Sequence, residues 1–120
     1  MKLTETAVQS AILEYLNCIR KIRAWRVNNT GVFDAKRGAY RKVKWGREGI
    51  PDIQGWLPDG RCLFIEVKKP TKSGKTPEPR PEQAEFLAEA SNHGHLAICV
   101  SSVSQVVQAL LESELNDAQD

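Results

Sequence analysis

Two short apolar runs separated by a tight turn constrain the fold of this chain more than any other feature. The first run covers residues 52–57, the second covers 62–68, and the sequence Pro-Asp-Gly lies between them at 58–60. Proline, aspartate and glycine favour turns, and apolar runs of this length between turn residues are typical of strands. The sequence therefore predicts a β-hairpin over residues 51–68.

Charged side chains interrupt this otherwise apolar hairpin. Asp52 opens the first run, and Glu66 and Lys68 lie two residues apart in the second. Residues two apart on a strand point to the same face, so Glu66 and Lys68 share a face while Val67 points into the opposite layer. Placing two carboxylates and an ammonium at the edge of a small core costs desolvation free energy. Binding of a divalent metal ion is the usual reason for such a cluster.

The other elements follow from the spacing of apolar residues. Apolar residues three and four apart predict a helix over 4–22, which Thr4 can cap and in which Glu5 occupies the first turn. Before the hairpin, we predict a strand over 24–28 and a loop over 29–48, with a short hairpin near Gly38 as an option. After it, we predict a helix over 82–93 that follows Pro81, a strand over 95–100, a helix from 101 or 102 to 115 and a frayed tail over 116–120.

The order of these elements predicts the topology, which reads α-β-β-β-α-β-α. The strand, helix and strand over 62–100 form a crossover unit, which should be parallel and right-handed. The hairpin over 51–68 is antiparallel by construction. A chain of 120 residues fits one domain over 1–120. We therefore expect a single α/β domain with a mixed β-sheet flanked by helices.

Charge is distributed unevenly along the chain. The net charge is only +2, yet the stretch from Arg20 to Glu48 holds ten Lys and Arg residues against two acids, and no Lys or Arg follows Arg80. The three cysteines are too dispersed for a disulfide framework or a zinc ribbon, which favours free thiols in a reducing compartment. No apolar stretch reaches membrane-spanning length, and no signal-peptide pattern is evident. We therefore expect a cytoplasmic protein without membrane partners.

The charged residues resemble those of a known enzyme family. Asp52, Glu66 and Lys68, with a glutamate early in the first helix, resemble the PD-(D/E)XK nuclease superfamily. The closer resemblance, to the VRR-NUC family over residues 4–103, rests on Glu5, Asn28-Asn29, Gly49-Ile50-Pro51-Asp52, Glu66-Val67-Lys68 and Gln83. That family is similar to virus-type replication-repair nucleases and Holliday-junction resolvases. The resemblance implies a restriction-endonuclease-like fold, a homodimer and cleavage of branched DNA in a bacterial or phage-infected cell.

The residue types fit phosphodiester hydrolysis, which needs a hydroxide nucleophile and neutralisation of charge at phosphorus. Asp52 and Glu66 offer hard oxygen ligands for Mg²⁺ or Mn²⁺. Lys68 can orient or deprotonate water and neutralise developing charge. The resemblance adds three further roles: the Val67 carbonyl as a metal ligand, Glu5 as part of the carboxylate shell, and Gln83 as a hydrogen-bond partner of the lysine, a water or the phosphate.

Each of these residues also has a purely structural interpretation. Asp52 can begin a turn, and Glu66 and Lys68 can form an ion pair on a solvated strand face. Glu5 and Gln83 can be ordinary polar residues in the first turns of their helices. Three other functions fit the same sequence: a monomeric flap or single-strand nuclease, a non-catalytic nucleic-acid-binding module, and a toxin or defence nuclease.

Basic side chains on two loops flank the proposed metal ligands. The predicted DNA contacts are Lys36, Arg37, Arg41, Lys42, Lys44, Lys69, Lys72 and Lys75. Trp45 lies among them and can stack on a base, whereas Trp25 and Trp56 lie on strands and are expected in the core. No helix-turn-helix or zinc module is present to read base sequence. We therefore expect recognition of DNA shape.

Overall fold

Three helices and six strands make up the fold in the computed structural model, which describes residues 4–27, 32–41 and 44–119. In chain order they are α1 (Glu5–Asn17), β1 (Arg23–Arg26), β2 (Val32–Asp34), β3 (Ala39–Arg41), β4 (Ile53–Trp56), β5 (Cys62–Val67), α2 (Pro81–Asn92), β6 (Leu96–Val100) and α3 (Val103–Gln119). Apart from the additional β2 and β3, the order is the one that the sequence predicts.

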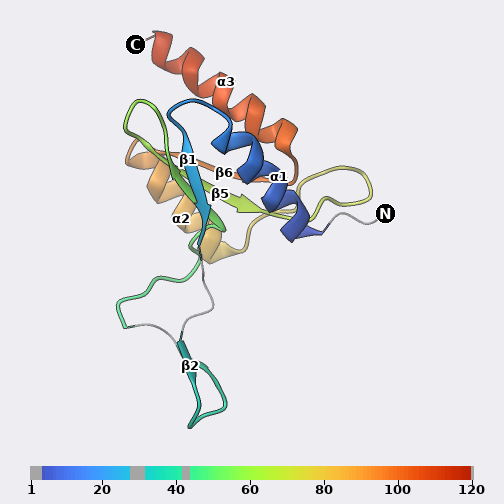
Figure 1. Ribbon diagram of the computed structural model, residues 1–120, viewed down its shortest axis with the longest axis vertical. Coiled ribbons are helices and arrows are strands. Elements are labelled where there is room, and N and C mark those ends of the chain that lie inside the picture. The colour runs from blue at the N-terminus through green and yellow to red at the C-terminus, as the bar shows by residue number, and fades with distance from the viewer. Residues whose placement is uncertain (1–3, 28–31, 42–43, 120) are drawn as a thin grey trace.

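The main sheet has four strands in the order β1-β4-β5-β6 (Figure 1). The β4 and β5 strands pair antiparallel, with Ile53 opposite Ile65, which confirms the predicted hairpin. The β5 and β6 strands are parallel and are connected through α2, which confirms the predicted crossover unit. The β1 strand adds antiparallel to β4. The sheet is therefore mixed, and the chain has the expected α/β architecture.

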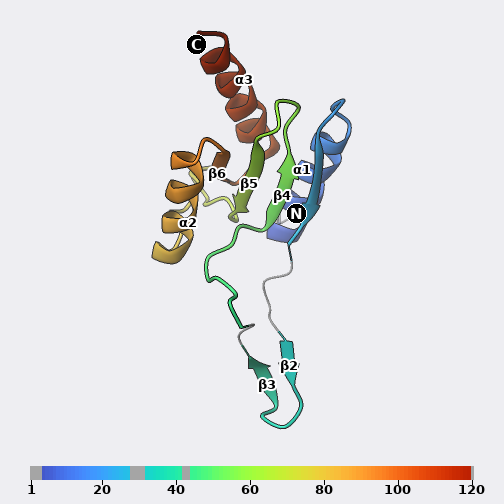
Figure 2. The same cartoon turned by 90° about the vertical axis from the view of Figure 1, so that its left-hand side faces the viewer.

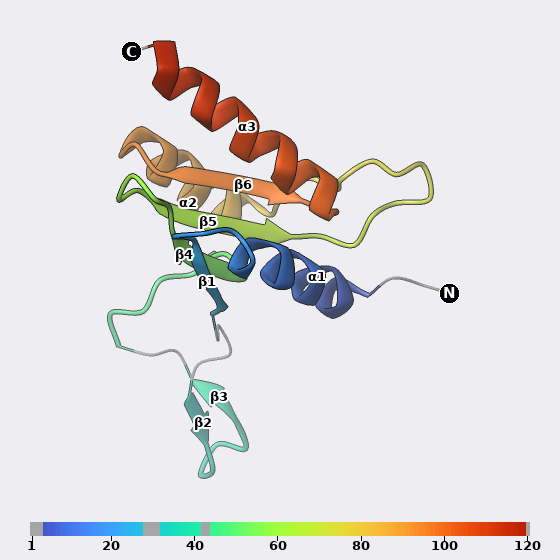
Figure 3. The same ribbon diagram turned by 45° about the horizontal axis from the view of Figure 1, so that its top comes forward.

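Helices cover both faces of this sheet (Figure 3). The α1 and α3 helices pack on one face, and α2 packs on the other face over β5 and β6. The fully buried side chains between the sheet and the first pair of helices are Ile12, Leu16, Ile53, Leu63, Ile65, Val67 and Val106. The alternation along β5 places Leu63, Ile65 and Val67 in this core, so its intervening residues face α2.

The α1 helix is shorter than predicted, because its last residue bonds to the next strand. Thr4 caps the helix as expected, with its Oγ1 accepting a hydrogen bond from the Ala7 amide at 3.0 Å. At the other end the Asn17 side chain donates to the Ala24 carbonyl at 3.0 Å and accepts from the Ala24 amide at 2.9 Å. These two bonds replace helical continuation, so the helix ends five residues before the predicted boundary at residue 22.

The long basic loop contains the hairpin that the sequence left as an option. The β2 and β3 strands pair antiparallel and form a separate two-stranded sheet. This hairpin projects away from the main sheet (Figures 1 and 2). Gly38 has a φ of +64° in its turn, a conformation that glycine adopts without steric cost.

The last helix also differs from its predicted bounds. It continues to Gln119 and not to Leu115, since no glycine or proline interrupts its C-terminal residues. Among the described residues, no helix combines the length and the apolar character needed to cross a membrane.

The prediction that Trp25 and Trp56 belong to the core is wrong. Trp25 is 36% exposed and Trp56 is 55% exposed. Both lie on the face of the sheet that α2 covers only over β5 and β6. Strand residues are buried on both faces only where both faces are covered. The tryptophans therefore lie on an open strip of sheet beside α2.

Candidate active site

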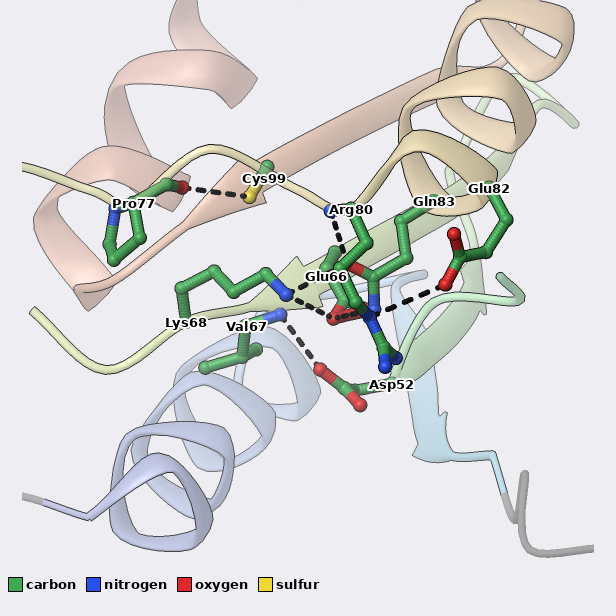
Figure 4. Close-up of polar contacts among 9 residues, drawn as sticks. All are labelled: Asp52, Glu66, Val67, Lys68, Pro77, Arg80, Glu82, Gln83 and Cys99. Carbon is green, nitrogen blue, oxygen red and sulfur yellow. Dashed lines mark hydrogen bonds and ion pairs between the residues drawn. The ribbon is translucent and has the colours of Figure 1, made fainter. Parts of the chain in front are cut away.

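The two predicted metal ligands meet where β4 begins and β5 ends (Figure 4). Because Ile53 pairs with Ile65, the residues before and after them, Asp52 and Glu66, lie across from one another on the same face. The Asp52 Oδ2 atom accepts a hydrogen bond from the Val67 amide at 2.9 Å. The hairpin register therefore brings together two carboxylates that are distant in sequence.

Glu66 carries a buried carboxylate whose two oxygens have different surroundings. Glu66 is only 4% exposed. Its Oε2 accepts a hydrogen bond from Gln83 Nε2 at 3.0 Å and lies 3.6 Å from Lys68 Nζ. Its Oε1 is buried and has no hydrogen-bond partner among the described residues. A buried acceptor in this state is costly unless a further group binds it.

The electrostatics of the site oppose a negative charge on Glu66. Burial is the largest cause and the Asp52 carboxylate is the second, and together they raise the pKa of Glu66 from 4.5 to about 7. The Lys68 ammonium acts in the opposite direction and only partly offsets the rise. A cation placed between the two carboxylates would remove this repulsion.

Gln83 connects the acidic and basic halves of the site. It lies in the first turns of α2 and is only 5% exposed. Its Oε1 accepts from Lys68 Nζ at 2.7 Å and from the Arg80 amide at 2.9 Å, while its Nε2 donates to Glu66. These three bonds fix which end of the amide faces which partner. Gln83 is therefore more than a polar first-turn residue: it holds Glu66 and Lys68 relative to one another.

A close contact between backbone segments places the start of α2 over the site. Pro81 occupies the first position of the helix, one residue before the predicted start at 82, because proline is tolerated in a first helical turn. Gly49 has a φ of +80°, and a Cβ at this position would lie 2.3 Å from the Glu82 carbonyl oxygen. Only glycine allows the chain to pass so close to the helix. The segment before Asp52 therefore packs against the helix turn that carries Gln83.

Sequence reasoning missed one contributor to the site, the backbone amide of Arg80. This amide holds Gln83 Oε1, and the Arg80 side chain lies 3.4 Å from Glu82 as an exposed ion pair. Backbone donors carry no residue-type signal. The only hint in the sequence is that Gln83 follows Pro81 by two residues. In a capping box, the side chain of the third helical residue accepts a hydrogen bond from the backbone amide of the N-cap residue, here Arg80.

The remaining predicted site residues are placed as follows. The Val67 side chain packs in the core, so that only its backbone faces the site. Glu5 is exposed in the first turn of α1. Within the described parts of the chain, no three His, Cys, Asp or Glu side chains gather as a metal-binding group, so Glu5 does not join Asp52 and Glu66 here. Its role, like that of the Val67 carbonyl, stays a prediction. Asn28 and Asn29 lie outside the described residues.

The predicted DNA-contacting side chains are largely on the surface. Lys36, Arg37, Lys44, Lys69, Lys72 and Lys75 are exposed. Lys42 and the side chain of Arg41 lie outside the described residues. Trp45 is 94% exposed and has a φ of +65°, which is rare for a bulky residue. These positions stay predictions, since exposure alone identifies no ligand.

The residues of the site fit a hard divalent cation. Asp52 and Glu66 supply carboxylate oxygens on one face, and a buried Glu66 oxygen has no partner within the described residues. Mg²⁺ is commonly bound by one or two carboxylates, with water and substrate phosphate as its other ligands. The cysteines do not compete for this role. Cys99 donates to the Pro77 carbonyl at 3.9 Å, and burial raises the pKa of its thiol.

The chain is similar in sequence to a phage protein. No family model matches the chain. A curated protein of Acyrthosiphon pisum secondary endosymbiont phage 1, named "Putative nuclease p44", is 36% identical over 64 residues. The match spans 53% of this chain and 63% of the phage protein, which is less than two thirds of its length.

Two solved structures share the fold over nearly the whole chain. A VRR_NUC domain has a TM-score of 0.62 at 24% identity and covers 88% of this chain and 92% of that chain. A VRR_NUC domain protein has a TM-score of 0.61 at 19% identity and covers 92% of this chain and 88% of that chain. The chain therefore has the VRR_NUC domain fold, as its resemblance to that family predicted.

Proposed function

We propose that the chain is a nuclease of the VRR-NUC family that hydrolyses phosphodiester bonds in DNA with Mg²⁺ or Mn²⁺. The observation that carries this proposal is the buried Glu66 carboxylate opposite Asp52, with one oxygen unpartnered among the described residues. A protein that only bound DNA would gain nothing from paired carboxylates beside a phosphate, because they repel it. The phage relative, which is named as a nuclease, and the VRR_NUC fold support the same function.

Asp52 and Glu66 would hold the metal ion, which when bound supplies an activated water and neutralises charge on the phosphate. The chain's own residues prepare the place for this chemistry. The Val67 amide orients Asp52, and Gln83 orients Glu66. Lys68 Nζ is held 2.7 Å from Gln83 Oε1, so its ammonium stays at the site, where it can donate hydrogen bonds to a water or a phosphate oxygen.

The substrate we infer is branched DNA, cut by a homodimer. The β2–β3 hairpin, which projects from the domain, presents Lys36 and Arg37 to solvent, where they can contact phosphates without reading bases (Figure 2). A chain of 13.4 kDa is small beside a four-way junction. Two copies related by a two-fold axis would place one site on each of two strands. The resemblance to junction resolvases supports this assignment.

The test compares DNA structures and metals in one experiment. The purified protein is incubated with labelled four-way junction, flap, single-stranded and linear duplex DNA, with Mg²⁺, with Mn²⁺ and with EDTA. Glu66→Gln serves as the inactive variant. Glu89→Gln serves as the matched control, since Glu89 is an exposed glutamate on α2 that pairs with Arg47. Light scattering of the same samples measures the number of copies in solution.

The expected result is metal-dependent nicking of the junction that Glu66→Gln abolishes and Glu89→Gln leaves intact, from a dimeric species. Cleavage of flaps or single strands alone by a monomer would keep the metal site and reject branched DNA as the substrate. Binding without cleavage of any DNA, in either metal, would reject the nuclease proposal and favour a binding module.

A further inference from the structure

An exposed aromatic pair lies on the main sheet, outside the proposed metal site. The rings of Trp25 on β1 and Trp56 on β4 meet edge to face, with centroids 5.0 Å apart. Gly55 makes this contact possible, because a Cβ there would lie 2.4 Å from the Arg23 carbonyl oxygen and would push β1 away from β4. The two rings are therefore held together by a close approach of their strands.

The pair lies on the same face of the sheet as the carboxylates. Residues two apart on an extended chain share a face, so Gln54 and Trp56 of β4 continue the face of Asp52, which directly precedes the strand. Trp25 pairs with Gln54 in the sheet register and lies on that face too. Four residues of strand span ~13 Å, which equals about four base steps of a DNA strand at ~3.4 Å each. DNA lying along β4 from the metal ligands would reach the aromatic pair.

Helix α2 leaves this part of the face open. It packs on β5 and β6, where Phe64 and Phe86 meet edge to face at 5.1 Å. The view in Figure 2 shows α2 beside the β5 and β6 side of the sheet, with β4 next to β5 and away from the helix. The exposed fractions of 36% for Trp25 and 55% for Trp56 show that their rings reach solvent.

We propose that Trp25 and Trp56 form a stacking platform for an unpaired nucleotide of the DNA substrate, a few nucleotides from the bond that is cut. This inference rests on the proposed nuclease function and names the part of the substrate that the open face binds. Bases stack on exposed aromatic rings whatever their identity, which suits an enzyme that recognises DNA shape.

The charge around the pair favours DNA over a second protein chain. Arg23 is exposed directly opposite Trp56 in the sheet register, where its guanidinium can contact a phosphate. The nearby acid Asp59 is paired with Arg61 at 2.6 Å, so it is partly neutralised. Two rings bordered by an arginine and a glutamine match one or two bases, and are small beside the surface that a stable protein interface buries.

The experiment measures binding without cleavage, in EDTA. The chain has three tryptophans, so Trp45→Phe leaves only Trp25 and Trp56 as emitters of tryptophan fluorescence. Emission is followed during titration with a single-stranded oligothymidine, with a four-way junction and with a linear duplex. Trp56→Leu keeps an apolar contact but removes the aromatic face, and Trp56→Phe restores an aromatic ring. Leu111→Ala, at a residue 50% exposed on α3, is the matched control for loss of an exposed apolar side chain.

The expected result is quenching by the single strand and the junction but not by the duplex. Trp56→Leu should raise the Kd for the single strand about 5- to 150-fold, the range measured for loss of one stacked base. Trp56→Phe should recover most of the affinity, and Leu111→Ala should leave it unchanged. Circular dichroism confirms that each variant is folded.

Three results separate this inference from the proposed function. Unchanged emission and affinity together with metal-dependent cleavage would overturn the platform and keep the nuclease. Quenching without cleavage would keep the platform and remove the nuclease. If Trp56→Leu dissociates a dimer and leaves DNA affinity unchanged, the pair is a protein interface and the platform is overturned.

Discussion

Removing the charge of Glu66 should stabilise the metal-free protein at high pH. Glu66 is 4% exposed, and burial together with the Asp52 carboxylate raises its pKa from 4.5 to about 7. Glu66→Gln keeps the shape and the acceptor that faces Gln83 Nε2, and puts an uncharged amide where the unpartnered oxygen lies. The substitution therefore removes the charge that the fold disfavours and little else.

The magnitude follows from linkage. A group whose folded-state pKa is raised contributes full stability below its unfolded pKa and loses that contribution as the pH rises through the folded pKa. For Glu66 the loss should begin near pH 4.5 and be nearly complete above pH 7. At ~1.36 kcal/mol per pKa unit, the shift from 4.5 to about 7 corresponds to roughly 3 kcal/mol. Glu66→Gln should match the wild type near pH 4.5 and exceed it by up to this amount at pH 8.

Urea unfolding in EDTA, at pH values from 4.5 to 8.5, measures this difference. Glu89→Gln is the control of opposite sign, because the hydrogen bond and charge of Arg47 lower the pKa of Glu89. Loss of the Glu89 charge should slightly reduce the stability of the protein at pH 8. Equal stability of Glu66→Gln and the wild type at pH 8, or a less stable variant, would refute the claim that the ionised Glu66 carboxylate destabilises the metal-free fold. Added Mg²⁺ or Mn²⁺ should stabilise the wild type and not Glu66→Gln.

Three further substitutions test the supports of the site and its DNA contacts. Gln83→Leu should lower the cleavage rate about 10- to 100-fold and raise the metal concentration needed for half-maximal rate, because Gln83 orients the ligand Glu66. Gln108→Leu, at an exposed glutamine of α3, should change neither quantity. A shift in rate without a shift in metal dependence would argue against a positioning role. Gly49→Ala should destabilise the protein more than Gly60→Ala in urea unfolding. Both residues have positive φ, which costs alanine about 1–2 kcal/mol, but only Gly49 faces backbone atoms. Lys36→Ala combined with Arg37→Ala should reduce the slope of log K for DNA against log salt by about 2, and an unchanged slope would remove the hairpin from the DNA contacts.

The hairpin and the site within it were predictable because short-range signals agree. Turn residues at 58–60 fix the pairing of β4 with β5, and this pairing alone places Asp52 opposite Glu66. The side-chain alternation of a strand then puts Lys68 on the side of Glu66 and Val67 in the core. No tertiary information was needed for these three placements.

The errors concern properties that depend on distant parts of the chain. The end of α1 is set by Asn17, whose amide bonds to Ala24 across a turn, and apolar spacing says nothing about such a bond. The exposure of Trp25 and Trp56 depends on how much of the sheet α2 covers. A strand sequence reports which residues share a face, but not whether a helix lies over that face.

The same limited coverage by α2 links the site to the open strip beside it. Its first turns must lie over Glu66 and Lys68 so that Gln83 can bond to both, and Gly49 allows the chain to pass that closely. A helix of 12 residues anchored there packs on β5 and β6 and leaves β4 and β1 uncovered on this face. The position of α2 that lets Gln83 hold Glu66 therefore also leaves β4 uncovered beside the carboxylates, where DNA can bind. A helix that also covered β4 would bury the residues from Asp52 to Trp56.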